Sequence, residues 1–285
     1  MAVLGVQMMM LKQQVAEQGM FPVLRQVRDL GYDAVEVSQI PMDEANTAGL
    51  EKGIAELGLD VGALSVALER NAFATGDTLD TDFDKIVDDC RRLGTRYVRI
   101  GMMPYEAMSS KSACEAWAAK CEAQAQRLGG EGITLLYHNH HVDLAQHEGE
   151  RIFDLVRRVA GSVAFEVDLF WVQRGGMAPL DMLEEYSGVC KTIHVKDFRV
   201  LPLPPESMDL LATGDPEDRA RFMTLFNTNV QFAEVGQGNM NWPALLPAAR
   251  RAGADYFFVE QDDQYGRDPM DCLRDSRDYL RSIGY

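Results

Sequence analysis

An apolar run leads directly into a group of histidines at Leu135-Leu136-Tyr137-His138-Asn139-His140-His141. This segment contains three of the five histidines, and His147 follows closely. The remaining histidine lies in a segment of similar form, Thr192-Ile193-His194-Val195-Lys196-Asp197. Neutral imidazole nitrogen binds Mn, Co, Fe and Zn well. Histidines at the ends of two buried strands therefore predict a site for a divalent metal ion.

Two further apolar segments end in carboxylates, at Val163-Ala164-Phe165-Glu166-Val167-Asp168 and Tyr256-Phe257-Phe258-Val259-Glu260. A single aspartate after a strand is more often a helix cap or a turn residue. A glutamate after Tyr-Phe-Phe-Val is costly to bury without a partner. Taken together, the four strand ends are expected to converge on one metal ion, held by His138, Asp168, His194 and Glu260.

Short apolar runs alternate with longer amphipathic runs along all 285 residues. Eight of the short runs are predicted strands, and several follow a glycine that could end the preceding helix. They lie at residues 4–7, 34–38, 61–66, 97–101, 134–138, 163–168, 192–196 and 256–260. Each strand leaves room for a helix after it, which predicts an α/β protein with one TIM (β/α)8 barrel domain over residues 1–285. A doubly wound open sheet is the alternative, disfavoured because no G-x-G-x-x-G turn follows the first strand.

Residues 199–231 break this rhythm as an extended segment after the seventh strand. Connections of this length usually have a function or are disordered. A short helix is predicted at residues 217–225, so we expect an ordered segment that lies over the barrel mouth. A surface decoration or a contact in a homo-oligomer is an equally good interpretation.

The formal net charge of −16 disfavours nucleic acid and anionic membrane surfaces as partners. The five cysteines show no C-x-x-C spacing, which indicates reduced thiols that fill space. No secretory signal and no apolar run of membrane-spanning length is apparent. The sequence therefore predicts a cytoplasmic protein that acts on a small molecule.

Several motifs resemble those of the xylose isomerase-like TIM-barrel superfamily, in particular its sugar phosphate isomerase/epimerase-type members with a Tyr-His-Asn-His motif. The matching segments are Tyr137-His138-Asn139-His140, Asp168-x-x-Trp171, His194-Val195-Lys196-Asp197, Glu234-Val235-Gly236-Gln237-Gly238-Asn239 and Val259-Glu260-Gln261-Asp262. They span roughly the C-terminal half of the chain. As a set they are specific for the superfamily and poor guides to the substrate.

The resemblance implies a divalent metal, above all Mn with Co, Mg, Fe or Zn as alternatives, at the ends of strands five to eight. It also implies an isomerase or epimerase that removes a proton next to the carbonyl of a sugar or keto-sugar, through an enediolate. The sugar epimerases of this superfamily have a glutamate at the first ligand position, whereas this chain has His138. A mechanism with two glutamates is therefore in doubt, which leaves Glu260 as the carboxylate base.

Roles for three further side chains follow from this reaction. Lys196 is expected to hold a substrate oxygen, and His140 to relay a second proton because an unshifted imidazole pKa lies near neutrality. Trp171 could line the substrate pocket or equally well pack in the core. Glu36 and Glu166 are expected deeper in the barrel, either supporting the ligands or pairing with Arg99 or Lys191.

Two other functions remain open. A lyase that removes water from a keto-cyclitol or keto-sugar, as inosose dehydratases of this superfamily do, begins with the same proton abstraction. A non-catalytic sugar-binding barrel is the second alternative, disfavoured because buried charges without a role are destabilising.

Overall fold

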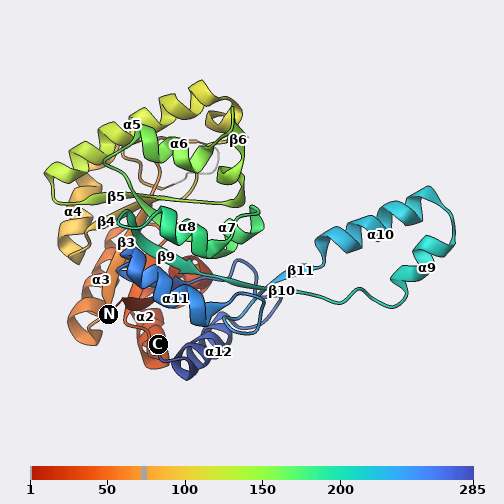
Figure 1. Cartoon of the computed structure of the whole chain (residues 1–285). Coiled ribbons are helices and arrows are strands. Elements are labelled where there is room, and N and C mark those ends of the chain that lie inside the picture. Colours follow the sequence, from red (N-terminus) through yellow and green to blue (C-terminus); the bar gives the residue numbers. More distant parts are fainter. Residues whose placement is uncertain (1, 72–75) are drawn as a thin grey trace.

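The computed structural model describes residues 2–71 and 76–285. Eight parallel strands close into a barrel in the order β1-β12-β9-β8-β5-β4-β3-β2 (Figure 1). Their bounds are β1 Val3–Gln7, β2 Ala34–Val37, β3 Asp60–Val66, β4 Tyr97–Ile100, β5 Thr134–His138, β8 Ala164–Asp168, β9 Cys190–Val195 and β12 Tyr256–Val259. All eight predicted strands are present, and closure of the sheet confirms the TIM barrel and excludes the open doubly wound sheet.

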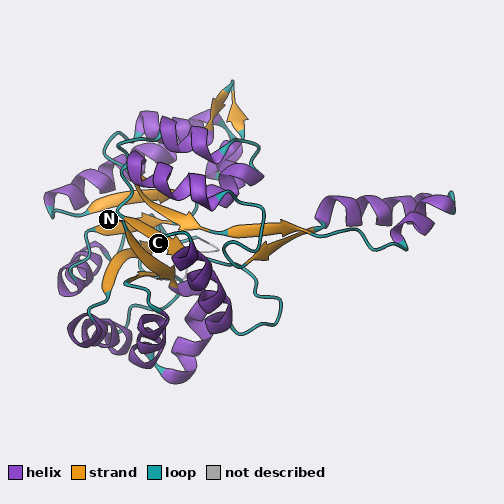
Figure 2. Ribbon diagram, turned by 60° about the horizontal axis from the view of Figure 1, so that its bottom comes forward, coloured by secondary structure: helices purple, strands orange, loops and turns teal. Residues whose placement is uncertain are grey.

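Helices surround the barrel on its outer face (Figures 1 and 2). They are α1 Lys12–Gln18, α2 Met20–Leu30, α3 Glu44–Leu57, α4 Phe83–Leu93, α5 Lys111–Gly130, α6 Ile152–Val159, α7 Leu169–Arg174, α8 Pro179–Glu185, α11 Trp242–Ala252 and α12 Pro269–Ser282. In α4, the apolar positions Ile86, Val87, Cys90 and Leu93 are all buried. The helix ends at Gly94, whose φ of 65° is the left-handed conformation that glycine adopts without strain.

Alternate residues of the strands form layers inside the barrel, because successive side chains of a strand point to opposite faces. The lowest layer is apolar and consists of Ala63, Tyr97, Leu136 and Ala164, with Tyr256 packed against it. Two residues further along these strands the inward side chains become charged, as in Arg99 after Tyr97. The floor of the barrel is therefore a small apolar core, and the polar groups lie above it toward the mouth.

Several short elements lie around the mouth of the barrel. They are the 3-10 helices η1 Met8–Leu11, η2 Ala107–Ser109 and η3 His141–Leu144, and the hairpin of β6 Gln146–His147 and β7 Glu150–Arg151.

An arm leaves the barrel after β9. Its base is an antiparallel pair, β10 Asp197–Val200 and β11 Val230–Ala233, and its end holds α9 Ser207–Ala212 and α10 Pro216–Thr228. The helix α10 confirms the predicted helix at 217–225. The expectation that this segment lies over the barrel mouth is wrong, because the two-stranded ribbon carries both helices away from the barrel (Figures 1 and 2).

The arm exposes an unusual amount of apolar surface. No residue of α10 is buried. Large apolar side chains of the arm are exposed at Val200, Met208, Leu211, Met223, Leu225, Phe226 and Val230. Surfaces of this kind often mark contacts between proteins, so the homo-oligomer remains a prediction that this surface suits.

The five cysteines are free and buried, as expected for thiols that fill space. Within the described residues, no helix is both long and apolar enough to cross a membrane.

Candidate metal centre

Four side chains meet at the mouth end of the barrel. His138 and Asp168 are the last residues of β5 and β8, His194 is the next-to-last residue of β9, and Glu260 directly follows β12. One atom of each lies within 4.8 Å of one atom of every other, and all four residues are buried. The structure thus brings together the four residues predicted to converge, which we call the ligand cluster.

The distances inside the ligand cluster are short. His194 Nδ1 lies 2.8 Å from Glu260 Oε2 and 3.1 Å from His138 Nε2. Asp168 Oδ2 lies 3.6 Å from each of these two ring nitrogens. Metal–nitrogen and metal–oxygen bonds of about 2.0 to 2.2 Å place the ligand atoms of one ion roughly 3 to 4.4 Å apart. The observed spacing is close to what one ion requires.

Both imidazoles are oriented by contacts on the side away from the cluster. His138 Nδ1 lies 3.1 Å from the carbonyl oxygen of Gly101, to which it donates when it carries the proton. His194 Nε2 lies 3.3 Å from a carboxylate oxygen of Glu36 and 3.2 Å from one of Glu166. These partners leave His138 Nε2 and His194 Nδ1 facing the cluster, the orientation typical of metal-binding histidines. Burial lowers the pKa of His194, but Glu166, Glu260 and Glu36 outweigh it and hold that pKa well above its usual range, so a metal ion bound here would replace its proton.

A second charged group lies beneath, and we call it the arginine cluster: Arg99, Glu36 and Glu166. The guanidinium of Arg99 is 2.7 Å from Glu36 Oε1 through Nη2 and 2.9 Å from Glu166 Oε2 through Nε. Thr192 Oγ1 donates to Glu166 Oε1 at 2.8 Å. Both expectations for these glutamates are therefore met, since they pair with Arg99 and also orient His194; Lys191 instead donates to the Gly188 carbonyl.

The ammonium group of Lys196 lies beside three carboxylates at the mouth end of the barrel. Its Nζ lies 2.6 Å from Glu260 Oε2, 3.1 Å from Asp168 Oδ2 and 3.1 Å from Asp262 Oδ1. Gln7, at the end of β1, donates to Glu260 Oε1 at 3.0 Å. Glu260 is thus fixed by groups from β1 and β9.

Electrostatics keep the ligand cluster in a state suited to a cation. Burial lowers the pKa of His138, so this imidazole is neutral. Burial raises the pKa of Asp168, but Lys196 and the two imidazoles outweigh it and hold that pKa well below its usual range. Burial likewise opposes ionisation of Glu260, but His194 and Lys196 lower its pKa. Both carboxylates are therefore ionised at neutral pH.

The donor set fits a divalent metal ion. Two imidazole nitrogens and two carboxylate oxygens suit Mn, Fe, Co or Zn and leave coordination positions for other oxygens. Asp168 Oδ2 and Glu260 Oε2 are buried and accept no well-aligned hydrogen bond. Buried charged oxygens that lack hydrogen bonds are stabilised most strongly by a nearby cation.

His140 lies beside the cluster but does not suit the relay predicted for it. Its ring centroid is 4.8 Å from that of His138. Burial lowers the pKa of His140 to about 2, and the charge of Lys196 acts in the same direction. A pKa this low disfavours the proton relay, which stays a prediction. His140 Nδ1 is buried without a partner, so the ring is a neutral hydrogen-bonding group.

Trp171 adopts neither of its two predicted roles fully. Its ring stacks on His141, with centroids 5.1 Å apart, and Lys196 Nζ lies 5.0 Å from the ring centroid. On its other side it meets Phe170 and Phe232, the latter from the base of the arm. Trp171 therefore supports Lys196 and His140 from behind and is not part of the cavity lining.

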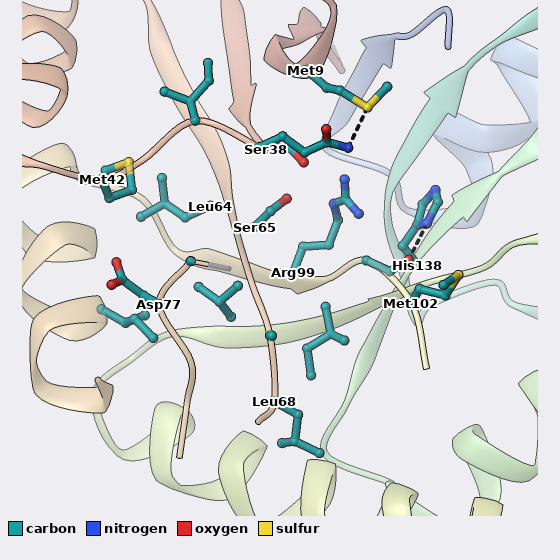
Figure 3. A pocket seen from close by; sticks show the side chains of 18 of the residues that line it. Met9, Ser38, Met42, Leu64, Ser65, Leu68, Asp77, Arg99, Met102 and His138 are labelled. Atoms are coloured by element: carbon teal, nitrogen blue, oxygen red, sulfur yellow. Dashed lines mark hydrogen bonds between the residues drawn. The ribbon is translucent and has the colours of Figure 1, made fainter. Parts of the chain in front are cut away.

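A cavity of about 1110 Å³ opens above the ligand cluster (Figure 3). His138, His140, Lys196 and Glu260 line one side of it. Asp262 also lines it, and burial raises the pKa of this carboxyl to about 6. Neither Asp262 nor Gln7 is predicted as a site residue from the sequence. The available signal was their position, since Gln7 ends β1 and Asp262 lies three residues past the end of β12.

The family model described as xylose isomerase-like TIM barrel matches residues 24–283. No curated protein matches the chain. Among solved structures, a sugar phosphate isomerase/epimerase from Parabacteroides distasonis ATCC 8503 is similar with a TM-score of 0.72 and 21% identity, covering 99% of this chain and 98% of that chain. The probable 3-DHS dehydratase AsbF from Bacillus anthracis has a TM-score of 0.67 and 12% identity, covering 98% of both chains. The IolI protein, solved with a binding zinc atom, has a TM-score of 0.67 and 15% identity, covering 99% of this chain and 97% of that chain.

Proposed function

The chain belongs to the xylose isomerase-like TIM-barrel family, and from this we propose that it is a divalent-metal-dependent isomerase or epimerase of a sugar or keto-sugar. One observation carries the proposal: the ligand cluster gathers two imidazoles and two carboxylates at the end of a large cavity. A structural neighbour named as a sugar phosphate isomerase/epimerase supports the choice of reaction.

The metal we propose is Mn, with Co, Mg, Fe or Zn as alternatives, since the donor set accepts several ions. His138, Asp168, His194 and Glu260 would hold it. Bound there, the ion would supply Lewis acidity toward substrate oxygens and neutralise developing negative charge. The zinc described for the IolI structure supports a metal in this fold.

Glu260 is the proposed base that removes the proton next to the carbonyl. It is ionised, lines the cavity and is held in place by Gln7 through its other oxygen. Lys196 lies beside it with a charged ammonium that can donate to a substrate oxygen as negative charge develops there. His140 also lines the cavity, where its neutral imidazole would make a hydrogen bond with a substrate hydroxyl.

A dehydratase is the second candidate function. The likeness to a probable 3-DHS dehydratase favours it. Elimination of water from a keto-cyclitol or keto-sugar begins with the same proton abstraction, so Glu260 and Lys196 would keep their roles.

The test is a panel of keto-sugars incubated with the Mn-loaded protein in deuterated water and followed by proton NMR. Loss of the proton signal next to the carbonyl, with an epimer or isomer as product, is the expected result. Exchange followed by loss of water would identify the lyase. Absence of exchange across the panel, with metal bound, would contradict both.

A further inference from the structure

The cavity extends far beyond the ligand cluster. Clefts that bind drug-sized ligands measure about 300 to 1,000 Å³, and this one measures about 1110 Å³. His138 and Glu260 of the ligand cluster, together with His140 and Lys196, line the side next to β5, β9 and β12. The rest is lined by residues from β1 to β4 and the segments that follow them. One sugar ring on the metal side would leave most of this volume unfilled.

Flexible apolar side chains line the cavity from Met102, which lies beside His138, to Met42 on the opposite side (Figure 3). Met9, Met42 and Met102 follow β1, β2 and β4 respectively, and each is partly exposed toward solvent. Leu64 and Leu68 also line the cavity and are buried. Methionine adapts its shape and makes favourable contacts with aromatic rings. We call these five residues the methionine wall.

The cavity offers little to an anionic group. Lys85 pairs with Asp77 at 2.7 Å and Asp89 at 2.8 Å, and Arg99 and Lys196 are each held by carboxylates in the same way. The only other described cation in the lining, Arg70, is exposed. A phosphate on the substrate would meet paired cations and the carboxylates of Asp43, Glu69 and Asp262.

We propose that the substrate is an uncharged glycoside whose sugar lies at the ligand cluster and whose apolar, preferably aromatic, aglycone lies against the methionine wall. This inference rests on the proposed function, because that function places the sugar at the ligand cluster. A glycosidic bond is the simplest link between a sugar and an apolar group. Because that bond blocks the anomeric carbon, the carbonyl next to the exchanging proton is a ketone on the sugar ring.

Binding and exchange are measured separately. Calorimetry gives dissociation constants for phenyl and methyl D-glucopyranosides, both anomers, with the Mn-loaded protein. We expect at least one phenyl glycoside to bind about tenfold more tightly than its methyl counterpart, since burying an aromatic ring contributes at least that much. Phenyl and methyl glycosides that bind within twofold of each other, or no measurable binding of the phenyl glycosides, would overturn the inference.

Matched variants locate the effect. The double variant Met42→Gln/Met102→Gln should reduce the phenyl-to-methyl preference to about twofold or less. The control Met208→Gln/Met223→Gln makes the same change on the arm and should leave the preference intact. A preference that survives the first double variant would place the aglycone elsewhere and contradict the inference.

Deuterium exchange of the corresponding glycosides with a ring ketone at C2, C3 or C4 tests the proposed function independently. Exchange without a phenyl preference in binding would leave the proposed function standing and refute the inference. A phenyl preference in binding without deuterium exchange in any ring ketone would refute the proposed function and leave the apolar subsite standing.

Discussion

Two pairs of buried carboxylates, Glu36 with Glu166 and Asp168 with Glu260, lie one above the other in the barrel and have different cations. In the arginine cluster, the guanidinium of Arg99 joins both carboxylates from within strand β4. In the ligand cluster, the cation is the ammonium of Lys196, which also lines the cavity. The lower pair is therefore neutralised permanently by a rigid group. The upper pair is neutralised by a flexible chain that a metal ion could supplement, which suits a site that must also admit a substrate.

The largest difference should appear in catalysis. Glu260→Gln removes the proposed base and should lower the rate of deuterium exchange by about a thousandfold or more, without unfolding the protein. Glu36→Gln changes a partner of His194 and Arg99 that lies outside the ligand cluster, and it should lower the exchange rate by roughly 10- to 100-fold. Glu56→Gln, on an exposed helix surface, is the matched control with no expected effect. Equal losses for Glu260→Gln and Glu36→Gln would contradict the separation of roles.

Removal of Arg99 and removal of Lys196 should affect the free energy of unfolding differently. Arg99→Met leaves two buried carboxylates without their partner and should lower the free energy of unfolding by about 3 to 5 kcal/mol. Added Mn²⁺ should not restore it. Lys196→Met should also destabilise the metal-free protein, but Mn²⁺ should restore most of the loss because the ion takes over the neutralisation. Urea unfolding with and without Mn²⁺ measures the unfolding free energy of both variants. If Mn²⁺ restored the stability of Arg99→Met, the assignment of the metal to the ligand cluster would be refuted.

Asp143 is a buried carboxyl group that pairs with neither Arg99 nor Lys196. It accepts hydrogen bonds from the Tyr137 hydroxyl and the His140 backbone, and within the described residues no ion pair joins it to a cation. Burial raises its pKa from 3.8 to about 6. Its contribution to stability is therefore full below pH 4 and is lost as the pH rises through about 6.

Replacement by asparagine removes that pH dependence. Relative to Asp143→Asn, the metal-free wild type should lose about 2 kcal/mol of unfolding free energy between pH 4.5 and 7.5. Urea unfolding at the two pH values checks this. A difference between the two proteins that is independent of pH would mean that Asp143 is ionised throughout.

The smallest effect concerns a single hydrogen bond of the arginine cluster. Thr192→Val removes the hydroxyl that donates to Glu166 while keeping the shape of the side chain. We expect a loss of about 1 kcal/mol in unfolding free energy and less than a tenfold loss in metal affinity. Thermal unfolding and metal titration measure the two, and a larger loss in metal affinity would mean that Glu166 controls the ligand cluster more directly than Glu36.

Much of the barrel was predictable because local sequence specifies it. Glycines with positive φ, such as Gly31, Gly58 and Gly253, end helices just before strands. The apolar strands end in His138, Asp168, His194 and Glu260, and parallel strands bring such ends to one rim. The ligand cluster could therefore be predicted without knowing any distance.

Other features depend on contacts between distant residues. The direction of the arm follows from the pairing of Asp197 with Ala233, which no local pattern indicates. The low pKa of His140 follows from burial and from the charge of Lys196, which directly follows β9. Sequence periodicity carries no information about either, so the arm was misplaced and His140 was given a proton-transfer role that burial disfavours.

The most direct test of the ligand cluster is the metal content of the protein and its variants after equilibration with Mn²⁺ and gel filtration. We expect about one ion per chain in the wild type, in Glu36→Gln and in Glu166→Gln, and almost none in His138→Ala and Asp168→Ala. Retention of the ion by the His138 and Asp168 variants, together with its loss from the Glu36 and Glu166 variants, would place it in the arginine cluster and contradict the account.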